Sequence, residues 1–247
     1  MNPRLGRLVE GAQSAEEAYD GLSATYDDAY LSPKDLAENA WLARYLATQG
    51  YCDGRVLDVG CGTGLLLDLC AIQPTMYTGL DVSDRMLEIA RLKHPEFRGN
   101  FARASMDAMT SLVGAERWQN VLYLFGTFSY ATEPEKAVSE LARVLMPGGR
   151  FFAMLLSHRY PDRASYSVMN AGYSVPIVTY DAKQAEQAFL TSPYLEVGRV
   201  RGLSVAVDRM QWLGNRLTKS YYSIEAATLG RWLPSESAYV VVEGYRL

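Results

Sequence analysis

Short apolar runs alternate along the chain with stretches whose apolar residues recur at helical spacing. The apolar runs predict strands at 55–59, 76–80, 100–104, 120–125 and 150–156. The helical spacing predicts helices at 63–72, 84–93 and 133–145. Strands that alternate with helices of roughly 10 to 15 residues are typical of βαβ units. The pattern therefore predicts an α/β fold of the Rossmann type, a doubly wound, mostly parallel sheet with helices on both faces.

The pattern changes after Leu156. Residues 158–179 are rich in tyrosine and serine and lack a clean period, which predicts a loop. Beyond that loop we expect a short helix at 181–190, strands at 195–203 and 238–246, and an inserted helix within 208–232. The first 45 residues are also predicted to be helical, and they carry a tyrosine cluster at Tyr19, Tyr26 and Tyr30. These tyrosines are either core aromatics or a cover over a binding site, with Tyr26 the strongest candidate for a cover.

A glycine-rich turn joins the first predicted strand of the core to its helix. The segment 56–67 reads VLDVGCGTGLLL, so the apolar strand runs directly into Gly60, Gly62 and Gly64. Glycines let the backbone turn tightly and approach a ligand, and the following helix N-terminus offers unpaired N–H groups. A dinucleotide-binding loop has the spacing GxGxxG, whereas this loop has GxGxG, with Leu65 where the third glycine belongs.

Two carboxylates accompany the turn. Asp58, two residues before Gly60, would repel a pyrophosphate but can pair with the ammonium group of an amino acid. Asp81 follows the next predicted strand, where a carboxylate accepts hydrogen bonds from ribose hydroxyls, as it also does in NAD-dependent proteins. An ammonium group and a nucleoside without phosphate occur together in S-adenosylmethionine. Asp58 and Leu65 therefore favour S-adenosylmethionine and disfavour an NAD(P)-dependent oxidoreductase.

Several segments in order resemble the class I S-adenosylmethionine-dependent methyltransferases, over most of the chain. VLDVGCGTG resembles their first motif, GLDVSDRML their acidic ribose motif, and VLMPGGRF the stretch that leads into the fifth strand. LFGTFSYATEPEKAVSELARVL and the early YDGLSATYDDAY are also similar, and the latter segment often closes over the cofactor in such enzymes. The resemblance implies seven strands with the last antiparallel, and methyl transfer that yields S-adenosylhomocysteine.

The expected cofactor-binding residues follow from the loop, the carboxylates and the resemblance. They are Tyr26, Asp58, Gly60, Cys61, Gly62, Gly64, Asp81, Val82, Met86, Ser105, Met106, Leu124 and Phe125. By resemblance, Met106 touches the adenine, and Leu124 and Phe125 line the floor of the site. The family usually has an acidic residue at the position of Ser105. Either Asp107 takes over that contact with the adenine amino group, or backbone and hydroxyl groups do.

His158 is the candidate catalytic residue. It follows the predicted strand at 150–156, at the carboxyl edge where ligands gather in open α/β sheets. A histidine there can take a proton from an oxygen or nitrogen acceptor, or else it shapes the pocket as a loop residue. Cys61 is expected only to pack, and His94 is expected at the surface. Tyr160, Tyr166 and Tyr173 either line an acceptor pocket or pack within their loop.

Composition narrows the classes of function. The formal net charge is −4, which disfavours nucleic acid as a partner, and the apolar runs are too short for a membrane span. Residues 1–11 do not resemble a secretory signal. Cys52, Cys61 and Cys70 form no CxxC pair, which predicts neither a disulfide framework nor a zinc site and favours a reducing, cytoplasmic location. With only two histidines, no metal site is expected.

We therefore expect one methyltransferase domain over 1–247. It comprises a helical cap at 1–45, a cofactor-binding core at 46–156 and a substrate-facing part at 157–247. The expected acceptor is a small organic metabolite, methylated on oxygen, nitrogen or carbon, with natural-product biosynthesis as one setting. The alternative is a non-catalytic regulatory protein that binds S-adenosylmethionine or S-adenosylhomocysteine on the same fold. Either a monomer or a homodimer is compatible with the sequence.

Overall fold

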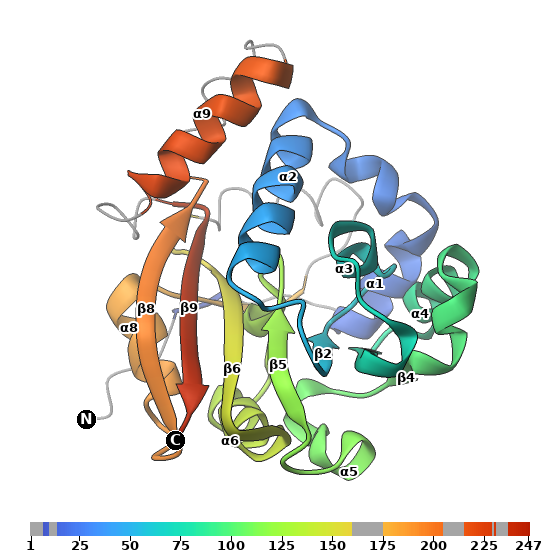
Figure 1. Ribbon diagram of the computed structural model, residues 1–247, viewed down its shortest axis with the longest axis vertical. Coiled ribbons are helices and arrows are strands. Elements are labelled where there is room, and N and C mark those ends of the chain that lie inside the picture. The colour runs from blue at the N-terminus through green and yellow to red at the C-terminus, as the bar shows by residue number, and fades with distance from the viewer. Residues whose placement is uncertain (1–6, 10–13, 160–174, 205–214, 229, 231–236) are drawn as a thin grey trace.

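The computed structural model describes residues 7–9, 14–159, 175–204, 215–228, 230 and 237–247. Within these residues the main sheet has seven strands, shown in Figure 1. Their order is β4 (Phe101–Arg103), β3 (Tyr77–Asp81), β2 (Val56–Val59), β5 (Trp118–Tyr123), β6 (Leu145–Leu156), β9 (Tyr239–Arg246) and β8 (Leu195–Leu203). The pairs from β4 to β6 are parallel, whereas β9 pairs antiparallel with both neighbours. The predicted fold class and the antiparallel last strand are confirmed.

Helices cover both faces of this sheet, which explains why its central strands are apolar on both sides. One face packs against α2 (Pro33–Thr48), α3 (Leu65–Leu69), α4 (Asp84–Lys93) and α9 (Asn215–Ala227). The other face packs against α5 (Thr110–Val113), α6 (Pro134–Val144) and α8 (Ala182–Phe189). The remaining helix, α1 (Ala15–Leu22), contacts α4.

A buried ion pair helps to hold α2 against the β8–β9 edge of the sheet. Glu243 of β9 and Arg201 of β8 lie 3.3 Å apart and are both buried. The Tyr45 hydroxyl of α2 donates to Glu243 at 2.8 Å, and the Arg201 guanidinium lies 3.9 Å from the centre of the Tyr45 ring. Because each charge is paired inside the fold, this contact fixes α2 over the strands that follow the core.

Several predicted boundaries need correction. The helix expected at 63–72 is only Leu65–Leu69, because Gly64 adopts the left-handed conformation before it and the chain is extended again at Cys70. The strand expected at 150–156 begins earlier, at Leu145, since Leu145 pairs with Trp118 across a register shift. Helix α4 and strand β8 have the predicted bounds.

Two predictions of the outer segments were wrong at specific residues. Residues 7–9, expected to be helical, form β1 (Arg7–Val9), and residues 177–179, expected to be loop, form β7 (Ile177–Thr179). These two strands pair antiparallel with each other, and pairing between segments so far apart leaves no local pattern. The inserted helix is found at Asn215–Ala227. Most of the rest of its expected range lies outside the described residues, and so do Tyr160, Tyr166 and Tyr173.

The cysteine prediction was also wrong. Cys52 and Cys70 form a disulfide, and Cys61 is free and buried. The end of α3 brings Cys70 beside Cys52, so that their Cα atoms are 6.1 Å apart. Their spacing in the sequence does not show this contact, and the cysteines therefore do not support a reducing compartment.

The search for membrane-spanning segments gave a negative result. Within the described residues, none of the helices combines the length and the apolar character needed to cross a bilayer.

Candidate cofactor site

The glycine turn lies where β2 ends and α3 begins. Gly60, Gly62 and Gly64 have φ values of 69°, 53° and 87°, in the left-handed region that glycine adopts at little cost. The backbone N–H groups of Gly60 and Cys61 both donate to the Leu80 carbonyl of β3, at 2.7 and 2.9 Å. The turn is therefore bound to the neighbouring strand, which places it beside Asp81.

Asp81 connects the glycine turn to the start of α4. Its two oxygens accept hydrogen bonds from the backbone N–H groups of Gly62 and Ser83, at 2.8 and 2.9 Å. Burial raises the pKa of this carboxyl group, and the backbone N–H groups of Ser83 and Gly62 oppose that shift. Each oxygen of an ionised carboxylate has capacity for a second donor, so Asp81 can hold the turn and still accept from two hydroxyls.

Asp58 lies on β2 beneath the turn and is 2% exposed. The Tyr77 hydroxyl donates to its Oδ2 at 3.0 Å. The pKa of Asp58 is raised to about 7, because burial and the nearby Asp81 charge, which raise it, outweigh the Tyr77 hydrogen bond, which lowers it. A buried carboxylate of this kind is stabilised in its charged form when a cation binds beside it.

A cavity of about 280 Å³ brings these groups together. It is lined by all but one of the expected cofactor-binding residues, namely Tyr26, Asp58, Gly60, Cys61, Gly62, Asp81, Val82, Met86, Ser105, Met106, Leu124 and Phe125. Gly64 is outside the lining and instead begins α3. That these residues hold the cofactor stays a prediction.

Sequence reasoning missed several polar and aromatic residues of the lining. They are Glu16, Thr63, Thr127, Tyr130 and Thr132. Tyr130 and Thr132 lie in LFGTFSYATEPEKAVSELARVL, a segment whose resemblance to methyltransferases pointed to a role but not to particular side chains. Asp107 was named only as an alternative to Ser105 for the contact with the adenine amino group, and Tyr19 only as a member of the N-terminal tyrosine cluster.

Three tyrosines of the N-terminal segment, Tyr19, Tyr26 and Tyr30, form an aromatic cluster with Tyr130 at the cavity. The ring centres of Tyr19 and Tyr130 are 5.6 Å apart, those of Tyr19 and Tyr26 are 5.9 Å apart, and those of Tyr26 and Tyr30 are 4.9 Å apart. Of these, Tyr19, Tyr26 and Tyr130 line the cavity. The structure therefore favours the interpretation of this cluster as a cover.

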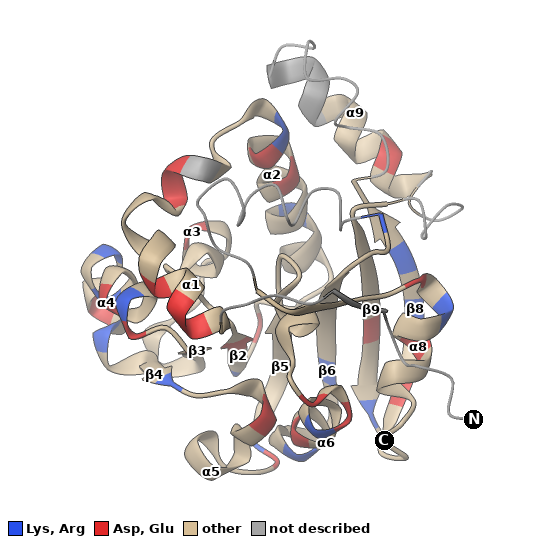
Figure 2. Cartoon of the chain, turned by 180° about the vertical axis from the view of Figure 1, so that it is seen from behind, with Lys and Arg blue, Asp and Glu red and all other residues tan. Residues whose placement is uncertain are grey.

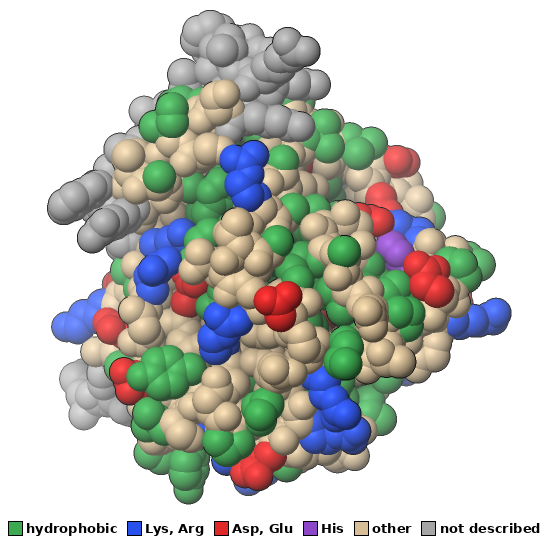
Figure 3. Space-filling model, in the orientation of Figure 1, with side chains coloured by type: hydrophobic (Ala, Val, Ile, Leu, Met, Phe, Trp, Pro, Cys, Tyr) green, Lys and Arg blue, Asp and Glu red, His purple; other side chains and the backbone are tan. Residues whose placement is uncertain are grey.

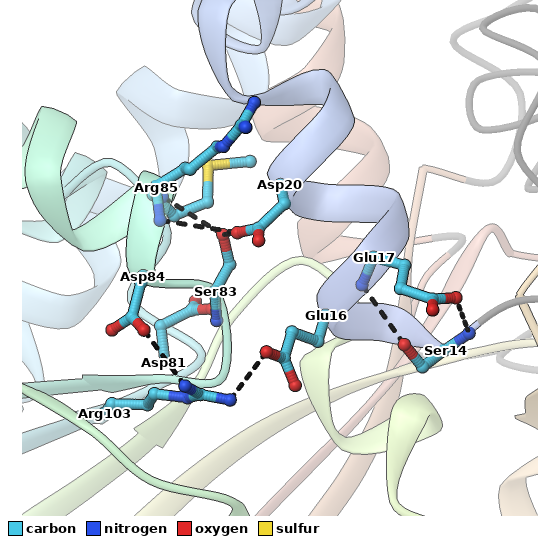
Figure 4. A network of polar contacts seen from close by, with 10 residues as sticks. Ser14, Glu16, Glu17, Asp20, Asp81, Ser83, Asp84, Arg85 and Arg103 are labelled. Atoms are coloured by element: carbon cyan, nitrogen blue, oxygen red, sulfur yellow. Dashed lines mark hydrogen bonds and ion pairs between the residues drawn. The ribbon is translucent and has the colours of Figure 1, made fainter.

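Polar contacts attach α1 to the core beside Asp81, as Figure 4 shows. Asp20 accepts hydrogen bonds from the Ser83 hydroxyl at 2.5 Å and from the Arg85 backbone N–H at 3.3 Å. Arg103 bridges Glu16 of α1 and Asp84 of α4, at 2.6 and 3.0 Å. These contacts hold the covering segment over the groups expected to bind the cofactor.

The prediction for His94 was wrong, whereas the prediction for His158 is not tested. His94, expected at the surface, is buried, and its ring would lie 2.8 Å from a Cβ added at Gly64. The 3₁₀ turn at Pro95–Asn100 follows it directly and folds the chain back, which accounts for this packing. His158 is absent from the cavity lining, and its Nδ1 lies 3.0 Å from the Thr179 hydroxyl. Its catalytic role stays a prediction.

Gly62 provides a direct test of the cavity. A Cβ built on Gly62 meets nothing within 4 Å, and Gly62 lines the cavity. Gly62→Ala is therefore expected to place a methyl group in the space where we expect the ligand to bind. We expect about a tenfold loss of affinity for S-adenosylhomocysteine, measured by calorimetry, equivalent to about 1.4 kcal/mol. Gly148→Ala is the matched control, because Gly148 also has a positive φ and open space around its Cβ. Equal affinity in the two variants would contradict the assignment.

No group of three or more His, Cys, Asp or Glu side chains suited to a metal ion occurs in the part of the chain that the structure describes. The residues present do fit S-adenosylmethionine. Asp58 suits its ammonium group, Asp81 suits its ribose, and the missing side chain of Gly62 leaves room for it.

Comparisons with known proteins find methyltransferases. The family model described as a methyltransferase domain matches residues 56–149, which include the glycine turn and both carboxylates. A ubiquinone biosynthesis O-methyltransferase of Nitrosomonas europaea is 26% identical over 183 residues, 72% of this chain and 75% of that protein.

Solved structures show the same fold at lower identity. A methyltransferase from Thermotoga maritima, described as a possible histamine N-methyltransferase, has a TM-score of 0.60 and 18% identity, covering 94% of this chain and 99% of its own. The [4+2]-cyclase SpnF has a TM-score of 0.64 and 18% identity, covering 95% and 97%. Since one of these proteins is named for a cyclisation, the fold alone does not decide the reaction. Taken together, the fold, the family model over residues 56–149 and the O-methyltransferase relatives make the chain similar to the class I S-adenosylmethionine-dependent methyltransferases.

Proposed function

We propose that this protein binds S-adenosylmethionine in the cavity beneath Tyr19 and Tyr26 and methylates a small organic acceptor. The observation that carries the proposal is the convergence of Asp58, Asp81 and the glycine turn on one cavity. Asp58 would hold the ammonium group, Asp81 the ribose hydroxyls, and the backbone of the turn the amino-acid part. When bound, S-adenosylmethionine supplies a methyl group on a positively charged sulfur.

The reaction requires little covalent chemistry from the protein. With S-adenosylmethionine bound, the bond between sulfur and the methyl carbon would break as the bond to the acceptor atom forms, and a protonated acceptor would give up its proton. The products are the methylated acceptor and S-adenosylhomocysteine. The chain contributes chiefly by positioning the two reactants, and Tyr26 and Tyr130 would help by excluding water from the cavity.

The charge distribution favours a small acceptor over nucleic acid. Lys and Arg residues are interspersed with Asp and Glu along the cartoon in Figure 2, and their side chains are scattered over the face shown in Figure 3. The net charge of −4 gives no general attraction for phosphate. The relatives named as ubiquinone biosynthesis O-methyltransferases make a phenolic oxygen the first acceptor to test. Nitrogen and carbon acceptors, and a role in natural-product biosynthesis, stay open.

The decisive assay is formation of S-adenosylhomocysteine with a panel of phenols, amines and activated carbon acids. A methylated product, identified by mass and formed in proportion to S-adenosylhomocysteine, would support the proposal. Binding of S-adenosylmethionine with no product from any acceptor would favour the alternative of a non-catalytic regulatory protein.

His158 is proposed as the base for an oxygen or nitrogen acceptor. The Thr179 hydroxyl, 3.0 Å from Nδ1, orients the ring. His158→Ala is expected to lower kcat about 100-fold, within the range for general base catalysis, with little change in S-adenosylhomocysteine affinity. His94→Ala is not a suitable control because His94 packs under the glycine turn. Thr179→Val serves better, with a smaller loss expected because it removes the hydroxyl beside Nδ1 and leaves the imidazole in place. Unchanged turnover in His158→Ala would remove it from the mechanism.

A further inference from the structure

The Cys52–Cys70 disulfide encloses the segment that carries the glycine turn. Cys52 lies in the turn between α2 and β2, and Cys70 is the residue at which α3 ends. The two cysteines are 18 positions apart in the sequence, and the chain between them forms β2, the glycine turn and α3. The bond therefore joins the entry and the exit of the segment on which the proposed cofactor site depends.

The turn that carries Cys52 is held by side chains of the sheet. The Asn120 side-chain amide of β5 donates to the Asp53 carbonyl at 2.7 Å, and the Arg150 guanidinium of β6 donates to the Gly50 carbonyl at 2.7 Å. These hydrogen bonds hold the backbone on both sides of Cys52. Cys52 is therefore a fixed anchor, whatever the state of its sulfur.

The segment that ends at Cys70 forms part of the cavity wall. Leu65 and Leu66 of α3 line the cavity, and the Cys70 backbone N–H donates to the Leu66 carbonyl at 2.9 Å. Helix α3 has five residues, too few to be stable without outside contacts. The ion pair of Asp68 with Lys93, at 3.5 Å, is partly exposed to solvent and adds little. The disulfide is therefore a major support for the end of α3.

A small reagent can reach this bond from one side. Cys52 is partly exposed, whereas Cys70 is 6% exposed, so an attacking thiolate meets the sulfur of Cys52. The third cysteine does not compete. Cys61 is buried, and burial together with the Asp81 and Asp58 charges raises the pKa of its thiol, which keeps it protonated and unreactive.

We propose that Cys52 and Cys70 form a reversible oxidation site for low-molecular-weight thiols and disulfides, and that its redox state sets the affinity of the cavity for its cofactor. In the oxidised protein the bond fixes the end of α3, and with it Leu65 and Leu66. In the dithiol form that end is released, and a ligand must order it on binding, which costs affinity. This inference rests on the proposed function, because its ligand is S-adenosylhomocysteine.

Reduction by a small dithiol takes two exchange steps. A thiolate of the reagent attacks the Cys52 sulfur, the bond to Cys70 breaks, and the Cys70 thiolate takes up a proton. The second thiolate of the reagent then attacks the reagent sulfur on Cys52, which releases Cys52 as a thiol. Two electrons and two protons pass to the protein, and the reagent becomes a cyclic disulfide. Oxidised glutathione reverses the change and yields two molecules of glutathione.

The experiment compares the two redox states of the wild-type protein. Calorimetric titration with S-adenosylhomocysteine follows incubation with oxidised glutathione or with dithiothreitol, and alkylation with mass spectrometry identifies the free thiols. Reduction is expected to weaken binding about three- to tenfold, the loss when the binding-competent conformation is about 10 to 30% populated. Reoxidation should restore the affinity. Cys52→Ala is the matched control, because it cannot form the bond and should bind like the reduced wild type in either buffer.

Thermodynamic linkage gives a readout that a purely structural disulfide would not move. If the disulfide favours S-adenosylhomocysteine by some factor, the ligand must favour the disulfide over the dithiol by the same factor. Titration in glutathione redox buffers, with and without saturating ligand, measures that second factor. A factor of ten corresponds to a shift of about 30 mV for a two-electron couple.

The outcomes separate this inference from the proposed function. Equal or tighter binding of S-adenosylhomocysteine after reduction would overturn the inference and leave the proposed function intact. Free thiols at both Cys52 and Cys70 after treatment with oxidised glutathione would do the same. Failure of the wild-type protein to bind the ligand in either redox state would overturn the proposed function, and this inference with it.

Discussion

Asp81→Asn is expected to weaken the binding of S-adenosylhomocysteine by about 100-fold or more, the loss of about two hydrogen bonds to a charged group. The physical reason is that Asp81 has two tasks. Its oxygens accept from the backbone N–H groups of Gly62 and Ser83, and Asp81 lines the cavity. An asparagine would turn an NH₂ group toward one of those N–H groups, which disturbs the glycine turn and removes a ribose acceptor together. Isothermal titration calorimetry measures the effect.

Glu88→Gln is the matched control for Asp81→Asn. Glu88 is an exposed acid on α4 outside the cavity lining, so its neutralisation changes the net charge equally without touching the site. We expect wild-type affinity in Glu88→Gln. An Asp81→Asn protein that is folded and binds S-adenosylhomocysteine as tightly as this control would show that Asp81 is only a cap for its neighbours.

The second large effect concerns pH. Burial raises the pKa of Asp58 to about 7, so the carboxyl group is mostly protonated below that pH in the ligand-free protein. Pairing with an ammonium group requires the charged form. Affinity for S-adenosylhomocysteine is therefore expected to be highest near pH 8 and to fall about tenfold per unit below about pH 7. Titrations in buffers of different ionisation enthalpy would also detect release of a proton on binding at pH 6.

Asp58→Asn is expected to remove this pH dependence and to bind about 10- to 100-fold more weakly at pH 8. Tyr77→Phe deletes the hydrogen bond that lowers the pKa of Asp58, so its affinity profile should shift to higher pH. The stability of the free protein depends on pH with the opposite sign to the affinity for the ligand. Because the folded-state pKa is raised, the stabilising contribution of Asp58 in the free protein is present below about pH 4 and is lost as the pH rises through 7. A pH-independent affinity in the wild type would contradict this account of Asp58.

Much of the core could be predicted because its signals are local. Helix α4 shows its apolar face in its own sequence, and the glycine turn is marked by Asp58 and by the spacing of its glycines. The order of strands and helices predicts the sheet, since crossovers between parallel strands follow a few rules. Twelve of the thirteen expected cofactor-binding residues line the cavity. Most of them lie in the glycine turn or close to the carboxyl ends of β2, β3, β4 and β5, where the sequence pattern could place them.

The rest depends on contacts between distant parts of the chain. Pairing of β1 with β7, the Cys52–Cys70 disulfide and the burial of His94 are each decided by the folded arrangement. Thr132 is a similar case, because its hydroxyl donates to Asp107, which is 25 residues away in sequence. No periodicity or motif marks such pairs before the chain has folded.

The most direct test of the central claim is a calorimetric titration of the wild-type protein with S-adenosylmethionine, S-adenosylhomocysteine and NADH. All three ligands carry an adenosine, but only the first two carry an amino-acid ammonium group, and NADH carries the pyrophosphate that Asp58 repels. We predict binding of the first two in the micromolar range or tighter, with no measurable binding of NADH. Binding of NADH in preference to S-adenosylmethionine would contradict the assignment of this site.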